Sequence, residues 1–496
     1  MANNHGKASR SAQKIFNNSL LYTLGTLASK AVGFFLIPIY TYHMSSEEYG
    51  IATTVIAFVA AFSIVASLSL NAALIRFYQD YTDDEKKRFV GTIVIGVIMN
   101  SVLFCFLLGL TAPLYADLLL KDIAFFPYIL LGILSLMFEG IYTIYQSLLQ
   151  AKQAGSRYSL NSIIYLFFHA VTVVLFVVVF KMGALGMILS NFATNVCFAV
   201  YGVFSMLKKG YMILTFDTGL FKKSIRYSLP ILPHNLSNNL NTYAVKVIIN
   251  SFLSYALSGI FSIAMQFSTM INLVQSSVNL AFRPWFIEQM KCGEEGRREI
   301  RHMTCMIMAL YSFCAVMISL VSRELIYFFA EESYFEGWRF VPLLIVAQLI
   351  SFVYYSHVQT LMYHVGISKF TSICSLSGLL TNIAVSLLLV KPLGVIGIVV
   401  GQVAAKTVMS ALTVYMSRKV EERVDFGLSK MIVFIVCAAI ICLGGILLSE
   451  MMKEHMFISI IGRVALAVIA FLIFILGYLP DYIMLFGAIF KKRRLK

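Results

Sequence analysis

The stretch YGIATTVIAFVAAFSIVASLSLNAALIRFY, residues 49–78, contains a single charged side chain, that of Arg76. An α-helix rises 1.5 Å per residue, so roughly 20 consecutive apolar residues cross the hydrocarbon core of a bilayer. The stretch therefore predicts a transmembrane helix over 49–75. Thirteen further segments have the same character, near 16–40, 89–112, 124–149, 158–180, 184–207, 227–252, 257–284, 302–321, 340–364, 370–390, 394–417, 430–449 and 457–480.

The composition agrees with this pattern. Hydrophobic residues make up 59% of the 496 positions and charged residues 13%, where a soluble domain carries about 25% charged residues. The sequence therefore predicts an all-α polytopic membrane protein with 14 transmembrane helices and excludes a soluble fold.

The basic residues alternate between the two sides of the predicted spans. With a cytoplasmic N-terminus, 27 of the 39 Lys and Arg residues fall in cytoplasmic segments and six on the opposite side. This asymmetry predicts that both termini are cytoplasmic. The net charge of +15 is then explained by topology and attraction to an anionic leaflet, and no nucleic-acid partner is needed.

Short motifs recur about 210 residues apart, in the same order. Residues 181–186, KMGALG, return as 391–397, KPLGVIG, and Gly50-Ile51 returns as Gly259-Ile260. Such a repeat predicts two six-helix lobes, 1–210 and 211–422, followed by two additional helices and a basic tail over 423–496. Two lobes related by an axis along the membrane normal form a V with a central cavity, an arrangement typical of transporters.

Six basic residues and one acidic residue, Glu139, lie within the predicted spans. Charged groups in hydrocarbon are costly, so they face water, a partner or a ligand. Five of the cations are candidate cavity residues for a negatively charged ligand: Lys30, Arg76, Lys246, Arg283 and Lys406. Arg76 and Arg283 also lie near enough to the ends of their spans to reach lipid headgroups. For the sixth, Arg463, snorkelling or a lipid contact is expected.

The span over 227–252 is unusually polar, with Pro230 and Pro233 in its first turns followed by a run of asparagines. Side-chain amides facing lipid would cost several kcal/mol each, so this helix lines water or packs inside protein. It suits a moving gate that binds a polar ligand, and the alternative is polar packing between helices. The candidate polar cavity residues are Asn235, Asn238, Asn239, Asn241 and Gln402.

Catalytic and metal-binding features are not predicted. The eight cysteines form no CxxC pair and have no histidine at ligand spacing, so no metal site is expected. The predicted external loops are short, and only 322–339 approaches twenty residues. We therefore expect a protein that is not an enzyme and has no cofactor.

Four motifs resemble a known family. They are SEEYGI at 46–51, NAALIRFY at 71–78, GIFS at 259–262 and NLAFRP at 279–284. They are similar to the Wzx-type polysaccharide flippases of the multidrug/oligosaccharidyl-lipid/polysaccharide (MOP) exporter superfamily. The resemblance covers essentially the whole chain and includes the count of fourteen spans.

The resemblance implies a flippase that moves an undecaprenyl-pyrophosphate-linked oligosaccharide across the bacterial cytoplasmic membrane by alternating access. It implies a cationic cavity for the pyrophosphate, to which Lys30 and Arg283 would correspond. The expected partners are the lipid-linked substrate, membrane lipids and other polysaccharide assembly proteins, and a monomer is expected. Some relatives carry an acidic residue in span seven that this chain lacks, so coupling to H+, Na+ or the membrane potential stays open.

Three other functions remain to be separated. A flippase for the peptidoglycan lipid precursor shares the fold and the substrate chemistry. A multidrug or cation antiporter of the same superfamily needs buried carboxylates, and only Glu139 is available. A membrane polymerase or glycosyltransferase needs a sizeable external loop with acid and base residues, which the loop lengths argue against.

Overall fold

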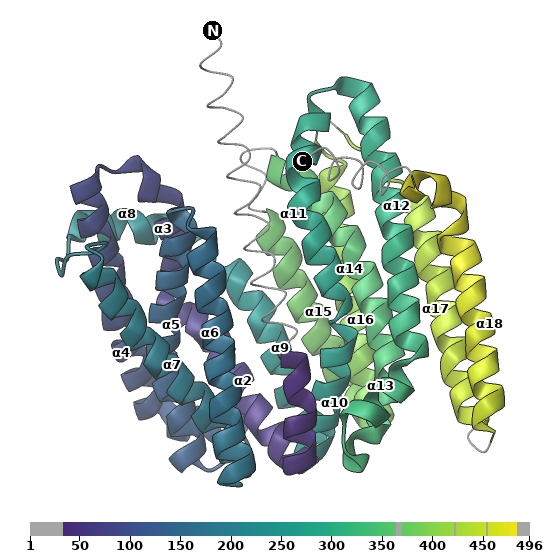
Figure 1. The fold of residues 1–496 in the computed structure, drawn as a ribbon, viewed down its shortest axis with the longest axis horizontal. Helices are drawn as coiled ribbons and strands as arrows, with labels where there is room; N and C mark the ends of the chain where they lie inside the picture. Colours follow the sequence, from purple (N-terminus) through teal and green to yellow (C-terminus); the bar gives the residue numbers. More distant parts are fainter. Residues whose placement is uncertain (1–32, 364–369, 421–422, 453–454, 484–496) are drawn as a thin grey trace. The chain divides into compact units, whose positions relative to one another are not determined.

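The computed structural model describes residues 33–363, 370–420, 423–452 and 455–483 (Figure 1). The described chain is helical and contains no β-strand within these ranges. It forms two compact units, which divide between Ser262 and Ile263. The predicted three-part division at 210 and 422 stays a prediction.

Among the described residues of the first unit, 33–43 are helical, and they are followed by eight complete helices and the beginning of a ninth. They are α2 (Ser46–Ser67), α3 (Leu70–Phe77), α4 (Asp83–Leu119), α5 (Leu130–Ala151), α6 (Gly155–Val173), α7 (Gly183–Lys208), α8 (Thr218–Ser228), α9 (Leu232–Phe252) and α10 (Tyr255–Ser268). Short helical turns lie at η1 (Tyr78–Asp80), η2 (Phe125–Ile129) and η3 (Val174–Val179). Helix α5 packs against α2, α4 and α7 and so occupies the middle of the unit.

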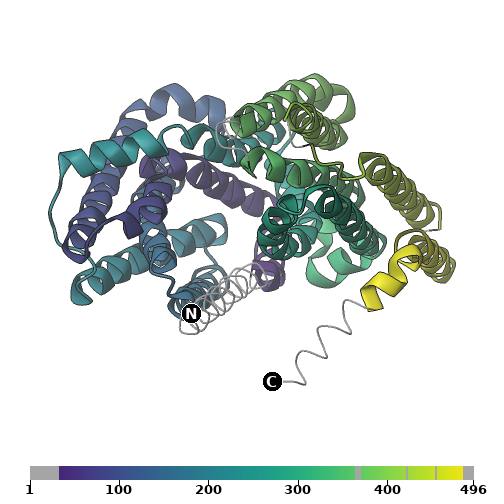
Figure 2. The ribbon, with the colours of Figure 1, turned by 90° about the horizontal axis from the view of Figure 1, so that it is seen from above.

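The second unit contains the remaining helices. They are α11 (Ile271–Met290), α12 (Gly293–Leu320), α13 (Ser322–Phe329), α14 (Phe340–Tyr363), α15 (Phe370–Leu393), α16 (Val395–Ser417), α17 (Leu428–Met451) and α18 (Met456–Phe474), with turns at η4 (Glu332–Arg339) and η5 (Leu476–Tyr478). Helices α17 and α18 pack against each other and against α12, and Figure 2 shows this pair toward the yellow end of the colour scale.

Eleven helical segments among the described residues are long and apolar enough to cross a membrane. They correspond to eleven of the predicted spans. The predicted span 16–40 lies largely outside the described residues, and 227–252 and 257–284 are helical but fall outside the eleven. The chain is thus a multi-pass helical protein, and the count of fourteen stays a prediction.

The predicted helix over 49–75 is broken in the structure. Leu68 and Ser69 adopt positive φ angles of 51° and 49°, which end α2 and start α3 in a new direction. A helix end leaves carbonyl groups without intrahelical partners. Here Asn100 donates to the carbonyls of Val65 and Ala66 at 3.0 and 2.7 Å. The break is therefore stabilised by a side chain from α4.

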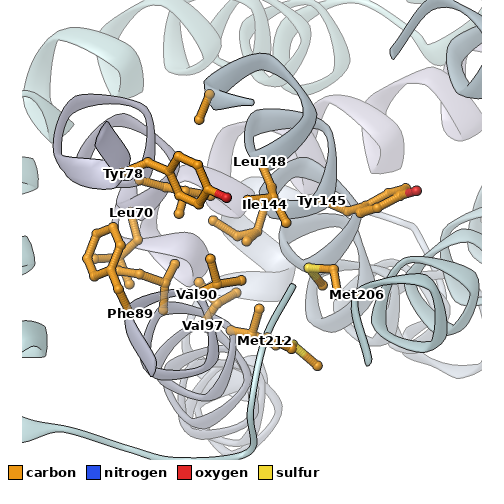
Figure 3. Packing of buried hydrophobic residues seen from close by; sticks show 14 of the residues in the cluster. Leu70, Tyr78, Phe89, Val90, Val97, Ile144, Tyr145, Leu148, Met206 and Met212 are labelled. Atoms are coloured by element: carbon orange, nitrogen blue, oxygen red, sulfur yellow. The ribbon is translucent and has the colours of Figure 1, made fainter. Parts of the chain in front are cut away.

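The apolar core of the first unit lies between α3, α4, α5 and α7 (Figure 3). Its fully buried members include Leu70, Phe89, Ile144 and Met206. Tyr145 shares this core, and its hydroxyl is hydrogen-bonded to Ser205 Oγ at 2.9 Å. The core fixes α3 and α5, two of the helices that form the polar cavity described below.

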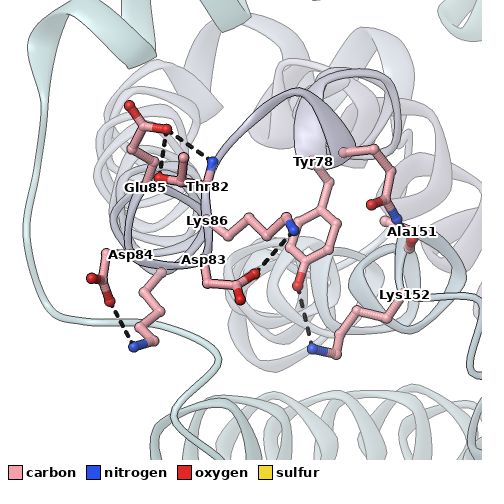
Figure 4. A network of polar contacts seen from close by, with 10 residues as sticks. Tyr78, Thr82, Asp83, Asp84, Glu85, Lys86, Ala151 and Lys152 are labelled. Carbon is pink, nitrogen blue, oxygen red and sulfur yellow. Dashed lines mark hydrogen bonds and ion pairs between the residues drawn. The ribbon is translucent and has the colours of Figure 1, made fainter.

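The loop between α3 and α4 is held by a polar network (Figure 4). Thr82 caps α4, and Glu85 bonds back to its amide and hydroxyl at 2.9 and 2.8 Å. This capping box satisfies amides that the first turn of a helix leaves free. Lys152 reaches across from the end of α5 and donates to the Tyr78 hydroxyl at 3.3 Å.

Helix α8 lies in a region expected to be a loop. Asp217 caps it by accepting from the amides of Gly219 and Leu220 at 2.8 and 3.0 Å. Leu220, Phe221 and Ile225 pack against the core of the unit. Three exposed cations conceal this apolar face in a hydropathy profile: Lys222, Lys223 and Arg226.

The two glycines matched by the sequence repeat touch each other where α2 crosses α10. A Cβ on Gly50 would lie 1.9 Å from the Tyr255 carbonyl oxygen, and a Cβ on Gly259 would lie 2.1 Å from the Ser46 carbonyl oxygen. Both contacts join elements that the repeat relates, since Gly50 and Gly259 are 209 positions apart. Such reciprocity is what a two-fold relation produces, and both positions need glycine for the close approach.

Candidate functional site

One polar face of α9 packs on α2 and its continuation. Asn235, Asn239, Lys246 and Asn250 follow one another at intervals of four, seven and four residues, which places them on one side of a helix. The Asn235 and Asn239 amides donate to Ser69 Oγ and to the Ala60 carbonyl at 3.4 and 2.7 Å. Asn250 donates to Thr54 Oγ1 at 3.0 Å. Part of the polar run is thus used for packing between helices.

Asn235 and Asn239 also border a polar cavity of ≈ 380 Å³ inside the first unit. The residues that line it come from α2, α3, α5 and α9, namely Ser63, Ile64, Ser67, Asn71, Glu139, Gly140, Thr143, Asn235, Asn238 and Asn239. Asn238 is exposed, and the bond that its amide forms with the described residues lies within α9, to the His234 carbonyl at 3.3 Å. Hydroxyls, amides and one carboxylate therefore surround a space large enough for part of a polar ligand.

Among the described residues that line this cavity, Glu139 is the one that carries a charge. It lies on α5, one turn before Thr143, and Ser63 of α2 is its hydrogen-bonding neighbour. Among the described residues it forms no ion pair. Neutral amides and a carboxylate are suited to the hydroxyl groups of sugars, whereas the described residues that line this cavity include no cation to hold a phosphate.

Lys246 lies two turns beyond Asn239 on α9 and is 8% exposed. Its ammonium group donates to Thr53 Oγ1 at 3.0 Å and to Ser262 Oγ, and these two hydroxyls are 3.3 Å apart. Thr53 and Ser262 are themselves 209 positions apart, the offset of the repeat. Within the described chain no carboxylate neutralises this buried cation, which is the usual mark of a functional residue in a membrane.

Lys246, Arg76 and Lys406, the candidate cations whose side chains are described, are not among the residues that line the polar cavity. Arg76 is exposed at the end of α3 and pairs with Asp80 at 3.3 Å. Lys406 is half-buried on α16 in the second unit. Lys30 lies outside the described residues, and Arg283 belongs to α11 with its side chain outside the described part. A cationic cavity stays a prediction.

Two predicted polar residues lie elsewhere. Asn241 is half-buried on α9 and does not line the cavity. Gln402 is buried on α16, and its amide donates to Met265 Sδ at 3.7 Å. Of the eight candidate residues whose side chains are described, the structure thus brings three to one cavity: Asn235, Asn238 and Asn239.

The expectation for Arg463 is wrong. Its side chain on α18 is only 6% exposed and forms two 2.6 Å bonds to Glu324, with a third at 2.9 Å to the Leu320 carbonyl. A bidentate carboxylate replaces the lipid headgroup that snorkelling would supply. Glu324 lies in an external connection of the sequence-based topology, so hydropathy alone gave no sign of the pair.

Sequence reasoning also missed the hydroxyl side of the cavity, formed by Ser63, Ser67 and Thr143. Small hydroxyl residues are common in membrane helices as packing groups, so they carry little signal by themselves. Glu139 was the available signal, because a lone carboxylate in a span marks a polar environment.

Comparisons with known proteins identify the family. Residues 15–290 match the family described as "Polysaccharide biosynthesis protein", over more than half of the chain. The "Lsg locus putative protein 1" of Haemophilus influenzae is 21% identical over 383 residues, which cover 75% of this chain and 90% of that protein. An "Uncharacterized membrane protein" of the same organism is 20% identical over 371 residues, 73% of this chain and 87% of that protein.

Solved structures share the fold. The lipid II flippase MurJ in an inward closed conformation superposes with a TM-score of 0.67 and 14% identity, covering 94% of this chain and 100% of that one. An inward-facing multidrug resistance MATE transporter of the MOP superfamily superposes with a TM-score of 0.60 and 14% identity, covering 80% of this chain and 94% of that one. A mutant of the Vibrio cholerae MATE transporter VcmN superposes with a TM-score of 0.57 and 11% identity, covering 83% of this chain and 97% of that one.

The polar cavity, the helical repeat and the many apolar helices fit these similarities. The resemblance to Wzx-type proteins inferred from four short motifs is confirmed by the family match and by the shared fold. This chain is a multi-pass membrane protein that belongs to the polysaccharide biosynthesis protein family of the MOP exporter superfamily.

Proposed function

We propose that this protein is a flippase that moves an undecaprenyl-pyrophosphate-linked oligosaccharide across the bacterial cytoplasmic membrane by alternating access. The match of residues 15–290 to polysaccharide biosynthesis proteins carries this proposal. The fold similarity to a lipid II flippase supports movement of a lipid-linked headgroup. The protein acts as a monomer with cytoplasmic termini, has no nucleic-acid partner and works beside other polysaccharide assembly proteins.

The polar cavity suits the sugar part of such a substrate. The cavity has a volume of ≈ 380 Å³ and is bordered by Asn238, Asn239 and Glu139, which offer both hydrogen-bond donors and acceptors. Sugar hydroxyls need both kinds of partner when they leave water, since an unpaired buried hydroxyl costs about 1–3 kcal/mol. The lipid tail stays in the bilayer while the headgroup passes through protein.

The pyrophosphate needs positive charge to offset its desolvation. Lys246 is our first candidate, because it is a buried cation without a described carboxylate partner. An ammonium group has three N–H donors, and hydroxyls engage two of them. Lys30, Arg283 and Lys406 are the further candidates, and Arg76 contacts the headgroup at the cytoplasmic mouth. Translocation is driven by an ion gradient, by the membrane potential or by consumption of the product.

Two alternatives use the same fold. A peptidoglycan lipid precursor flippase is favoured by the TM-score with MurJ. A multidrug or cation antiporter is favoured by the similarity to MATE transporters and by the lone carboxylate of Glu139 in the cavity. Both predict transport by the purified protein but of different compounds.

Translocation in proteoliposomes tests the proposal. Purified protein is reconstituted with an undecaprenyl-pyrophosphate-linked oligosaccharide, and exposure of the sugar on the opposite face is followed with a membrane-impermeant glycosidase. We expect the wild type to expose the sugar and N238A to slow exposure several-fold, because the variant removes a cavity amide that makes no bond to another helix. The control is T242A, an exposed position of α9 that does not line the cavity.

Each result has a defined meaning. Equal rates for N238A and T242A would remove the polar cavity from the substrate path. Transport of lipid II in preference to the oligosaccharide would assign the protein to peptidoglycan precursors. Gradient-driven export of a cationic drug without movement of either lipid would favour the antiporter.

A further inference from the structure

Helix α8 and the segment before it lie against α4 on an apolar cavity that is separate from the polar one. The Phe221 ring rests directly on Gly96, where a Cβ would lie 2.4 Å from the ring. The Ile213 carbonyl lies against Gly91 in the same way, 1.9 Å from the position of a Cβ. Thr92 Oγ1 accepts from the Asp217 amide at 3.1 Å. Helix α8 is therefore seated on α4 at a defined position.

The cavity between α8 and α4 has a volume of ≈ 750 Å³ and is almost entirely apolar. It is lined by Leu68, Gly96, Ile98, Met99, Asn100, Val102, Leu103, Phe106, Phe216, Phe221 and Ile225. The one amide among them, on Asn100, is already bonded to the Val65 and Ala66 carbonyls. Met99, Leu103 and Phe106 are also exposed on the outer side of α4. The cavity is thus an open groove suited to a hydrocarbon chain.

Helix α8 carries cations next in sequence to the residues that line this groove. Phe221 and Ile225 face the groove, and Lys222 and Arg226 follow each of them by one position, or 100° around the helix. Both cations are exposed. Lys223 lies further round and is engaged elsewhere, donating to the Tyr81 hydroxyl at 3.1 Å and lying 4.7 Å from the Phe77 ring centroid. Lys222 and Arg226 are therefore the two exposed cations of α8 that directly follow a groove residue.

The residues before α8 have the character of a membrane-surface anchor. Ile213, Leu214 and Phe216 are exposed apolar side chains directly preceding the cationic helix. Apolar residues beside Lys and Arg on a short amphipathic helix are typical of a segment that lies in the interface of a bilayer. The helix also packs on α3 and α4 near the basic Lys86-Lys87-Arg88 run.

From this geometry we propose that the α4–α8 groove binds one anionic phospholipid, with an acyl chain in the groove and the phosphate held by Lys222 and Arg226. Charge complementarity selects the occupant, because a zwitterionic lipid adds a positive group next to two cations. The polar cavity and Lys246 take no part in this site, so the inference is independent of the proposed function.

Lipid binding to the intact detergent-solubilised protein, measured by native mass spectrometry, tests the site. Phosphatidylglycerol and phosphatidylcholine with identical chains are the probes. We expect the wild type to prefer phosphatidylglycerol and the K222Q/R226Q double variant to bind it about tenfold more weakly, with phosphatidylcholine binding unchanged. The matched control is K208Q/K209Q, which removes two exposed cations at the end of α7.

A second variant tests the groove itself. L103W places a large ring at a lining position that is 57% exposed, so it fills the groove without disturbing the core, and we expect it to weaken phosphatidylglycerol binding. If K222Q/R226Q and K208Q/K209Q lose phosphatidylglycerol binding equally, diffuse surface charge binds the lipid and the proposed site is wrong. The remaining outcome is that a polyprenyl pyrophosphate displaces phosphatidylglycerol and binds more weakly to the same variants. That result would contradict phosphatidylglycerol as the occupant and assign the groove to the substrate lipid.

Discussion

Single residues show how this chain accommodates charge in an apolar environment. Arg463 is neutralised by a bidentate carboxylate, whereas Lys246 has only hydroxyl partners among the described residues. An arginine fork matched by a carboxylate is a structural solution. A buried ammonium bonded to hydroxyls keeps its charge available, which is why we propose a functional role for Lys246 and a structural one for Arg463.

The Arg463–Glu324 pair makes stability depend on pH. Partial burial opposes ionisation of Glu324, but the bonds from Arg463 outweigh it and hold the pKa of this carboxyl below its ordinary value. A lowered carboxyl pKa adds stability above the unfolded pKa of about 4.3, and that stability is lost as the pH falls through the folded pKa. E324Q should therefore cost about 1–2 kcal/mol at pH 7, less than a fully buried pair because Glu324 is 39% exposed.

Thermal unfolding in detergent measures this effect. The melting temperature of E324Q should lie below that of the wild type at pH 7, and the difference should shrink as the pH falls below about 4. E332Q is the control, because it alters an exposed carboxyl in the same connection. A difference in melting temperature that stays constant with pH would show that Glu324 acts through packing and not through its charge.

At the scale of elements, the contact between α2 and α10 depends on two glycines. A Cβ on Gly50 would meet the Tyr255 carbonyl oxygen at 1.9 Å, and backbone cannot move aside as a flexible side chain does. We expect G50A to lower the free energy of unfolding by about 1–3 kcal/mol through overpacking. Denaturation in detergent measures the change.

The control for G50A is G109A, an α4 position where a Cβ has no atom within 4 Å. Alanine there should be neutral or stabilising by up to about 1 kcal/mol, because it favours the helix. Equal stability of the two variants would mean that the helices separate at this crossing without cost.

Elements also show what the sequence can and cannot predict. The spans 340–364 and 394–417 agree within a residue with α14 and α16, because a bilayer demands long uninterrupted apolar helices. The break at Leu68 could not be predicted, since Asn100 of another helix satisfies it. Helix α8 was missed because its cations mask an apolar face that becomes apparent only against α4.

Part of the candidate site could likewise be predicted from the sequence, and part could not. Asn235, Asn238 and Asn239 were predicted because amides cannot face hydrocarbon. They share a cavity with Glu139 through the tertiary arrangement of α5 and α9, which no local pattern encodes. The hydrogen bonds of Asn235 and Asn239 to α2 and its continuation likewise required the folded structure.

At the scale of the whole molecule, the distribution of basic residues predicts which loops face the cytoplasm. Positive residues hold loops on the cytoplasmic side during insertion, so the α3–α4 loop is assigned there and the segment after α4 to the opposite face. We expect D84C to react with a membrane-impermeant maleimide only after spheroplasts are permeabilised, and K121C to react in intact spheroplasts. Both positions are exposed.

Background labelling needs a control, because Cys197 and Cys292 are exposed in the natural chain. Serine at both positions provides the parent for the two variants. Labelling of D84C in intact spheroplasts with protection of K121C would invert the topology and place α8 and its groove in the outer leaflet. Since the α4–α8 groove lies beside the start of α4, this experiment fixes which leaflet the proposed lipid site faces.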